Sequence, residues 1–509
     1  MNVDPRTPVV VGVGQAAEQI DDPYYRAMSA VELAAAGARA ALEDCRADVA
    51  KVAASIDTVA GVRQFEISGP AEAVLGKSNN YPRSVANRID ADPVRAILEV
   101  VGGQGPQKLI NELAGEIAAG RSEVALVFGS DATSTNRYFA NSENKPDFSE
   151  HIDGQLEDRG HGIEGLISRY TVIHGLVDAP TQYALLENAR RAGTGLGPAD
   201  YLRRMGELFA PFTKVAAGNP FAAAPVERSV EELITVTDSN RMISDPYPRL
   251  LVARDQVNQG AAALLMSVGA AQRFGVPEEN WVYLAGHADL AEQRLLGRPD
   301  LGHAPSAVLA VREALALAGI GIDDVATFDL YSCFAVPVFN ICDGLGIAPD
   351  DPRGLTLTGG LPFFGGAGNN YSMHAVAETV AATRTSPGQY GLVGANGGIL
   401  SKYSVGLYTT TPTPWQADRS AQLQAQTDAR PLEAVTEDAE GRGTVETYTV
   451  RRDNGQLTGI IIGRLDADHS RFLATTEDDD LIALLTEGEP LQEAVTVCSF
   501  DYGNRCSLS

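Results

Sequence analysis

Two segments of the sequence carry side chains that could act as nucleophiles or transfer protons. The segment YSCFA contributes Tyr331, Ser332 and Cys333, and the segment NNYSMHAVAE contributes Tyr371 and His374. A cysteine is nucleophilic as its thiolate, and tyrosine or histidine can move a proton when its surroundings shift its pKa. We interpret these five side chains as candidate catalytic groups.

The same residues also fit a purely structural interpretation. Cys333 precedes Phe334, which is typical of a buried apolar thiol. His374 stands at the start of a predicted helix and could simply cap it or pack. Tyr331 and Tyr371 could be hydrogen-bonded core tyrosines. The residues alone leave both interpretations open.

Glycine-rich loops accompany these candidates. Glycine allows tight backbone geometry and can present N–H groups to a thioester or a phosphate. We therefore predict that four loop glycines contact a ligand, namely Gly103, Gly105, Gly366 and Gly394. Asn396, in the loop GLVGANGG, is a sixth candidate catalytic side chain. No GxxxxGK[ST] signature is present, so no nucleotide-phosphate site of that kind is expected.

The elements that must position these loops alternate between strand and helix up to about residue 410. Apolar runs predict strands and Ala-rich amphipathic segments predict helices, which indicates α/β layers around a mostly parallel sheet. The predicted strands are 8–15, 56–62, 95–101, 123–129 and 257–268, and the predicted helices are 29–44 and 106–119. Segment 305–331 repeats the pattern of 29–62, so an internal duplication is plausible, although any two such units look similar.

Two segments interrupt this rhythm. Residues 130–245 contain mixed helices and polar loops, which we interpret as an insertion over the α/β layer. After a polar, Pro-containing linker at 409–426, short alternating segments predict a β-barrel or sandwich of about 90 residues. In it, DNGQ at 453–456 is a hairpin signal and EDDDL at 477–481 an acidic turn.

Composition excludes several classes of protein. The 509 residues carry a net charge of −26, which disfavours nucleic acid or an anionic membrane as partner. No run of 18 apolar residues and no secretory signal is seen, so we expect no membrane segment and a cytoplasmic location. Five scattered cysteines form no disulfide framework and no CxxC pair, and no metal site is predicted.

Several segments, in order over residues 8–410, resemble the thiolase superfamily of acyl-CoA Claisen-condensing enzymes. They are VNQGAAALLMS, AVREALALAGIGIDDVATFDLYSCFA, GGLPFFGGAGNN and GLVGANGG. The resemblance implies a five-layered αβαβα core from two duplicated halves, 1–270 and 271–410. A loop domain at 130–245 would cover the active site. We expect 420–509 to add a small all-β, OB-like domain.

The catalytic groups of that superfamily are absent at the matching positions. Its nucleophilic cysteine falls on Gly103, and its loop asparagine on Tyr331. Its histidine falls on Gly366, and its second cysteine on Gly394 or Ala395. Cys333 matches a sterol-carrier type of thiolase. Some thiolase-fold aldolases use tyrosines in these loops and need a small OB-fold partner.

The resemblance leaves three functional hypotheses. The first is an acetyl-CoA acetyltransferase-like enzyme with a non-standard site, or a carbon–carbon lyase that uses the loop tyrosines. The second is a non-catalytic protein that binds CoA, acyl-CoA or a lipid carrier. The third is a scaffold that recruits a protein through its C-terminal domain.

A CoA thioester is the expected ligand and no other cofactor is required. The chain could be a monomer, or a homodimer that pairs through 95–101.

Overall fold

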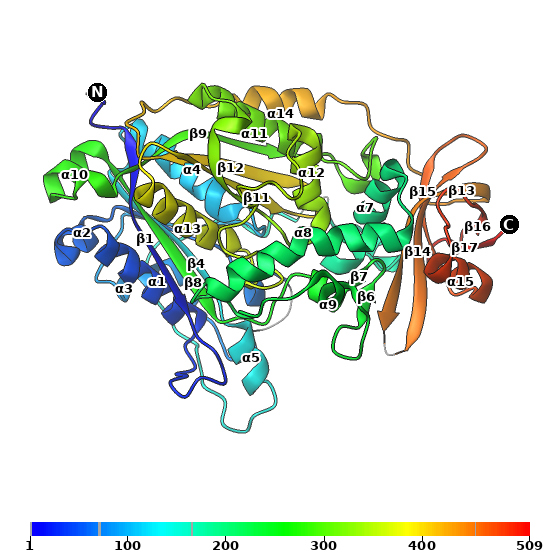
Figure 1. Cartoon of the computed structure of the whole chain (residues 1–509). Helices are drawn as coiled ribbons and strands as arrows, with labels where there is room; N and C mark the ends of the chain where they lie inside the picture. Colours follow the sequence, from blue (N-terminus) through cyan, green and yellow to red (C-terminus); the bar gives the residue numbers. More distant parts are fainter. Residues whose placement is uncertain (1–2, 70–72, 164–165, 454) are drawn as a thin grey trace.

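The computed structural model describes residues 3–69, 73–163, 166–453 and 455–509. A mixed ten-stranded sheet with helices on both sides forms the larger part of the molecule, and a β-barrel lies at one end (Figure 1). Within the described ranges, no helix is both long and apolar enough to cross a membrane.

The N-terminal half supplies six strands of the large sheet. They are β1 (Pro8–Ala17), β2 (Thr58–Gly61), β3 (Arg95–Leu98), β4 (Val124–Asp131), β5 (Glu157–Asp158) and β8 (Gln259–Ser267). Its helices are α1 (Ala30–Asp44), α2 (Val49–Ser55), α3 (Tyr81–Asn87) and α4 (Gly105–Ala118). The predicted Ser29 cap of α1 is confirmed, because Ser29 and Glu32 form a reciprocal capping box.

The C-terminal half supplies the other four strands. They are β9 (Val282–Ala291), β10 (Val325–Leu330), β11 (Tyr390–Gly397) and β12 (Lys402–Thr409). Its helices are α10 (Val268–Phe274), α11 (Pro305–Ala318), α12 (Ala335–Leu345) and α13 (Tyr371–Thr385).

Strand order confirms the internal duplication. The N-terminal half has the order β2-β4-β8-β1 and the C-terminal half has the equivalent order β10-β11-β12-β9. In each half the first pair is parallel and the next two are antiparallel. The expectation of a mostly parallel sheet is therefore wrong, because the last strand of each half returns antiparallel between its neighbours.

Helices and strands of the two halves form alternating layers. Helix α4 contacts β12 and α13 contacts β8, so the central helix of each half packs on the other half's strands. Helices α1 and α11 cover the outer faces. Strands β1 and β9 meet at Val9–Tyr283 and Val10–Val282, where the two halves join into one sheet.

The segment between β4 and β8 lies beside both the core and the barrel (Figure 1). It contains α5 (Thr133–Phe139), α6 (Arg169–Ile173), α7 (Ala179–Thr194), α8 (Pro198–Gly218), α9 (Val230–Ile234), β6 (Met242–Ser244) and β7 (Tyr247–Pro248). Strand β6 pairs with the barrel through Ser244 and Arg451.

Strand β3, the expected dimer-edge strand, is covered along part of its outer edge. Its Ile97 and Leu98 pair in parallel with Glu157 and Asp158 of β5. The edge through which 95–101 is expected to join a second copy is therefore covered by this chain itself at Ile97 and Leu98.

The C-terminal part begins with α14 (Ser420–Asp428) and closes into a barrel. Its elements are β13 (Gly441–Asp453), β14 (Gln456–Leu465), β15 (Arg471–Thr476), α15 (Asp479–Glu487), β16 (Ala494–Cys498) and β17 (Arg505–Leu508). The order β13-β14-β15-β17-β16 returns to β13, with a helix between the third and fourth strands. This is the OB-fold arrangement, so the expected OB-like domain is confirmed.

Two local predictions in the barrel have different outcomes. The strands on either side of the DNGQ turn pair as expected at Asp453 and Gln456, although Asn454 lies outside the described residues. The acidic turn at 477–481 is instead the start of α15. Asp478 caps this helix by accepting the Leu481 N–H at 2.9 Å, and acidic residues stabilise the positive end of the helix dipole.

Candidate functional site

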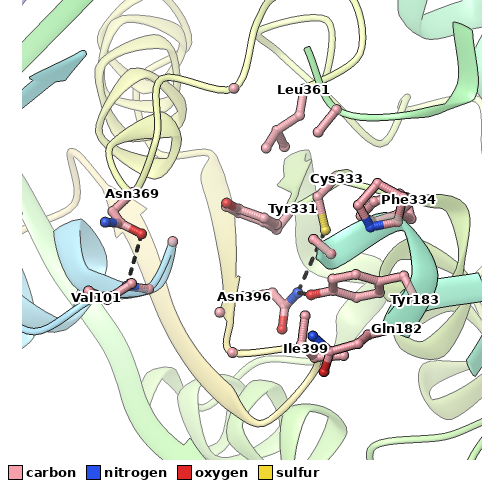
Figure 2. A pocket seen from close by; sticks show the side chains of 18 of the residues that line it. Val101, Gln182, Tyr183, Tyr331, Cys333, Phe334, Leu361, Asn369, Asn396 and Ile399 are labelled. Atoms are coloured by element: carbon pink, nitrogen blue, oxygen red, sulfur yellow. Dashed lines mark hydrogen bonds between the residues drawn. The ribbon is translucent and has the colours of Figure 1, made fainter. Parts of the chain in front are cut away.

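A cavity of about 500 Å³ lies where loops of both halves meet the inserted segment (Figure 2). Its wall includes residues that follow β3, β10 and β11, and the start of α7. Ligands of α/β proteins bind at such loop clusters beyond the carboxyl ends of strands. The wall is mainly apolar and includes Leu166, Ile167, Val252, Leu295, Leu361 and Ile399.

Cys333, Asn396 and Tyr183 converge on one side of the cavity (Figure 2). Asn396 donates from Nδ2 to the Tyr183 hydroxyl at 2.8 Å, and this nitrogen lies 4.0 Å from Cys333 Sγ. The Tyr183 ring stacks on Phe334, with centroids 4.5 Å apart. Burial raises the pKa of the Cys333 thiol to about 12, so it stays protonated at neutral pH.

Tyr331 occupies the space beside Gly103, the position on which the resemblance places the superfamily's nucleophilic cysteine. A Cβ built on Gly103 would stand only 2.1 Å from the Tyr331 hydroxyl oxygen. A cysteine at 103 would therefore overlap Tyr331, and one of the two would have to shift. Burial raises the pKa of Tyr331, so its hydroxyl is a neutral hydrogen-bond donor in the cavity wall.

Three of the predicted catalytic side chains lie outside the cavity wall. Tyr371 donates to Asp329 Oδ1 at 3.0 Å and contacts the Thr358 hydroxyl at 2.6 Å. His374 Nδ1 contacts Gln15 at 2.7 Å, and burial lowers its pKa to about 3. The Ser332 hydroxyl accepts the Leu361 N–H at 3.3 Å.

The structural interpretation therefore fits these three residues, because each side chain is buried and makes its contacts within the core. Tyr331 and Tyr371 do approach each other as predicted, edge to face with centroids 5.4 Å apart. Only Tyr331 reaches the cavity.

Two of the four predicted ligand-contacting glycines line the cavity and two do not. Gly103 and Gly366 line the cavity. Gly105 begins α4, and Gly394 lies within β11, where a Cβ would stand 2.2 Å from the Tyr403 hydroxyl. Gly394 therefore serves close packing, whereas a Cβ at Gly105 would meet its nearest atom only at 3.7 Å.

Several residues of the wall are not predicted from the sequence. Asn369 lies in the quoted loop GGLPFFGGAGNN, and its Oδ1 accepts the Gly102 N–H at 3.0 Å. Tyr183 lies in the insertion, which resembles no family motif. Arg254 and Arg298 are charged residues of the wall that no motif marks.

The arrangement can hold an apolar group and donate hydrogen bonds to it, but it lacks an activated nucleophile. No histidine lines the cavity among the described residues. The one carboxylate in the described wall, Asp255, is paired with Arg137 at 2.5 Å. No cluster of three potential metal ligands occurs in the described parts of the chain.

Comparisons with known proteins agree with this fold. The model of the thiolase-like protein type 1 additional C-terminal domain matches residues 422–499. No curated protein matches the chain. The structure of an acetyl-CoA acetyltransferase from Syntrophomonas wolfei has a TM-score of 0.56 at 15% identity, over 80% of this chain and 99% of that one. The Ltp2-ChsH2(DUF35) aldolase has a TM-score of 0.59 at 17% identity, over 80% and 98%. Both likenesses show the fold alone.

A much closer likeness covers both chains completely. It is to the monomeric SCP2-thiolase like protein type 1 from Mycobacterium smegmatis, with 58% identity and a TM-score of 0.87 over 100% of each chain. The identity extends over the thiolase-like core, the inserted segment and the barrel. This chain therefore belongs to the SCP2-thiolase-like protein type 1 family.

Proposed function

We propose that this protein binds the acyl part of a CoA thioester in the cavity without forming an acyl-cysteine. The observation that carries the proposal is the Tyr331 hydroxyl, which fills the nucleophile's space while the apolar cavity beside it stays open. A cavity of this size lies in the range of small-molecule sites.

In this proposal, uncharged hydrogen-bond donors of the cavity wall face the bound thioester. Tyr331 and Asn396 both line the cavity and both can donate to a thioester carbonyl oxygen. The Cys333 thiol, with its raised pKa, contributes apolar surface rather than a thiolate. This favours binding over acyl transfer.

The test combines calorimetric titration of CoA and hexanoyl-CoA with intact-protein mass spectrometry. We expect saturable binding that is tighter for the acyl-CoA, no conversion of the thioester, and no acyl mass on the protein. Tyr331→Phe keeps the ring and removes the hydroxyl, and we expect binding roughly five- to tenfold weaker, as for one neutral hydrogen bond. An acyl adduct on a cysteine, or no binding of any CoA species, would refute the proposal.

A second candidate function is cleavage of a carbon–carbon bond in a β-hydroxyacyl-CoA, giving a carbonyl compound and a shortened acyl-CoA. The specific observation in its favour is that Tyr331 faces the cavity in a chain that also carries an OB-like barrel. A neighbour of the same fold is named an aldolase. Its test is mass spectrometry of a β-hydroxyacyl-CoA incubated with the protein, where product that disappears in Tyr331→Phe would establish it.

The proposed assembly is a monomer in the cytoplasm. The pairing of β3 with β5 and the monomeric relative both support the proposal of a monomer. Light scattering after size-exclusion chromatography tests it, and a mass of twice 53.8 kDa would contradict it. Binding of another protein to the C-terminal barrel stays a prediction.

A further inference from the structure

The cavity wall carries an excess of positive charge in a strongly acidic protein. Its charged residues in the described chain are Arg254, Asp255 and Arg298. Asp255 is neutralised by Arg137, whereas neither arginine of the wall has a carboxylate within 4.0 Å among the described residues. The protein as a whole carries a net charge of −26.

Arg298 is the more unusual of the two arginines because it is only 2% exposed. Its Nε donates to the Gln293 carbonyl at 2.9 Å. Its Nη2 donates to the carbonyls of Ile399 and Leu400 at 3.1 and 3.2 Å. Its Nη1 is buried and has no hydrogen-bond partner.

The charge of Glu292 favours the charged form of Arg298, but Glu292 forms no ion pair with it and is engaged elsewhere. Glu292 accepts the backbone N–H groups of Gln293 and Ser306 and lies 3.8 Å from Arg430. Although burial lowers the pKa of Arg298 to about 10, the guanidinium stays charged at neutral pH. Three neutral carbonyls hold the guanidinium in place, and no carboxylate of the described residues is in direct contact with it.

A buried charge without a counter-ion is unfavourable, and native proteins pair such charges. A bound anion would supply the missing partner, and arginine binds carboxylates through charge-assisted hydrogen bonds. The surrounding wall is apolar, and Leu295 and Ile399 line the cavity beside Arg298. An apolar wall with one buried cation matches an apolar chain that ends in a carboxylate.

We propose that the cavity binds an aliphatic chain bearing a terminal carboxylate, with that carboxylate on Arg298. The chain can come from a free carboxylic acid or from an acyl thioester with a carboxylate at its far end. Only the thioester form rests on the function proposed above.

The experiment compares matched pairs of ligands by calorimetric titration into the full-length protein. Sodium octanoate is compared with methyl octanoate, and adipoyl-CoA with hexanoyl-CoA, because each pair differs mainly in one carboxylate. We expect the wild type to bind the carboxylate member roughly tenfold or more tightly in at least one pair, as for a charged hydrogen bond. The first pair identifies free acids as the source, and the second identifies thioesters.

Variants assign the preference to a residue. Arg298→Met should abolish the preference for the carboxylate ligand, and Arg298→Lys should retain part of this preference. Arg294→Met removes an exposed charge from the same segment and should change nothing. Equal affinities within both pairs for the wild type overturn the proposal even if Arg298→Met does not fold. A preference that survives in folded Arg298→Met overturns it as well. Failure of hexanoyl-CoA to bind contradicts the function proposed above but leaves the octanoate comparison decisive here.

Discussion

Tyr331 shows how one side chain can change what a scaffold does. The loop after β10 brings its hydroxyl to the place where a side chain at 103 would project. The resemblance implies a nucleophilic cysteine at 103, and this chain has the Tyr331 hydroxyl there. The change needs both a large residue at 331 and a glycine at 103. The two positions should therefore be energetically coupled.

Restoring a cysteine at position 103 tests this coupling. Gly103→Cys should destabilise the protein by about 1–3 kcal/mol, because its Cβ would overlap the Tyr331 ring. Tyr331→Ala removes the ring, so the double variant should be more stable than the sum of the single changes by about 1 kcal/mol or more. Urea unfolding of the four proteins measures this, and additive effects would contradict the overlap.

His303 provides a residue-scale prediction about pH. Its Nδ1 lies 2.8 Å from Asp300 and its Nε2 lies 3.7 Å from Asp343, and the hydrogen bonds to these carboxylates raise its pKa to about 9. The folded state therefore holds this proton more tightly than the unfolded chain, whose histidine has a pKa near 6.5. The stabilisation is complete below pH 6.5 and is lost as the pH rises through 9.

The measurement is urea unfolding of wild type and His303→Gln between pH 6 and 10. The stability difference between them should shrink over this range, by less than about 1 kcal/mol because solvent screens the partly exposed pair. His151→Gln, which removes an exposed histidine, is the control and should follow the wild type. A difference that does not change with pH would contradict the ion pair.

The sequence identifies residues of the cavity wall where the residue type itself suggests chemistry. It does not identify residues that reach the wall only through tertiary contacts. Tyr331, Cys333, Asn396, Gly103 and Gly366 all line the cavity, and their catalytic or ligand-binding roles stay predictions. Tyr371, His374 and Ser332 have the same chemistry but point into the core, and which way a loop side chain points is set by packing. Arg298 could not be found, because only the fold brings it beside the cavity.

At the scale of elements, the short strand β5 is the clearest addition to the α/β core. Arg159, directly after it, donates to Glu99 at 2.7 Å, Glu112 at 2.6 Å and Glu157 at 2.8 Å. Glu99 is fully buried, and its other ion-pair partner is Lys108 at 2.6 Å. This network fixes β5 on the edge of β3.

Arg159→Ala should therefore cost about 2 kcal/mol, between the values for surface and buried ion pairs. It should also speed hydrogen exchange in β3 and β5. The control is Arg121→Ala, which removes an exposed partner of Glu116 and should leave stability unchanged. Equal effects of the two variants in urea unfolding would contradict a structural role for β5.

Most helices and strands of the core can be predicted from the local sequence pattern. The predictions fail where the direction of a strand depends on which other strands it pairs with. The predicted strands and helices up to residue 410 correspond to observed ones within a few residues. The direction of β8 and β12 was not predicted, because apolar runs do not encode whether a strand is parallel. The start of helix α15 resembles an acidic turn in the sequence, because Asp478, Asp479 and Asp480 precede its first apolar residue.

At the scale of the whole molecule, the barrel is bonded to the wall of the cavity. Arg471 of β15 is fully buried and donates to the carbonyls of Leu296 and Arg298 at 2.7 and 2.6 Å. Its charge is balanced by Glu446 of β13, at 2.6 Å. Arg191 of α7 forms a second link, to Glu489 at 2.5 Å. The barrel thus holds the backbone that carries the Arg298 guanidinium.

This connection predicts that a change inside the barrel alters the cavity. Arg471→Met removes two hydrogen bonds to the 296–298 backbone and leaves Glu446 without its buried partner, although Arg464 still lies 3.1 Å from it. We expect a loss of about 3 kcal/mol in stability and faster amide exchange over 293–298. Ligand affinity in the cavity should fall in parallel with this local loosening. Arg442→Met, which removes an exposed charge from the same barrel, should change none of the three quantities. If Arg471→Met lowers stability but leaves both the exchange of 293–298 and the affinity at wild-type values, the barrel acts as an independent appendage and does not support the site.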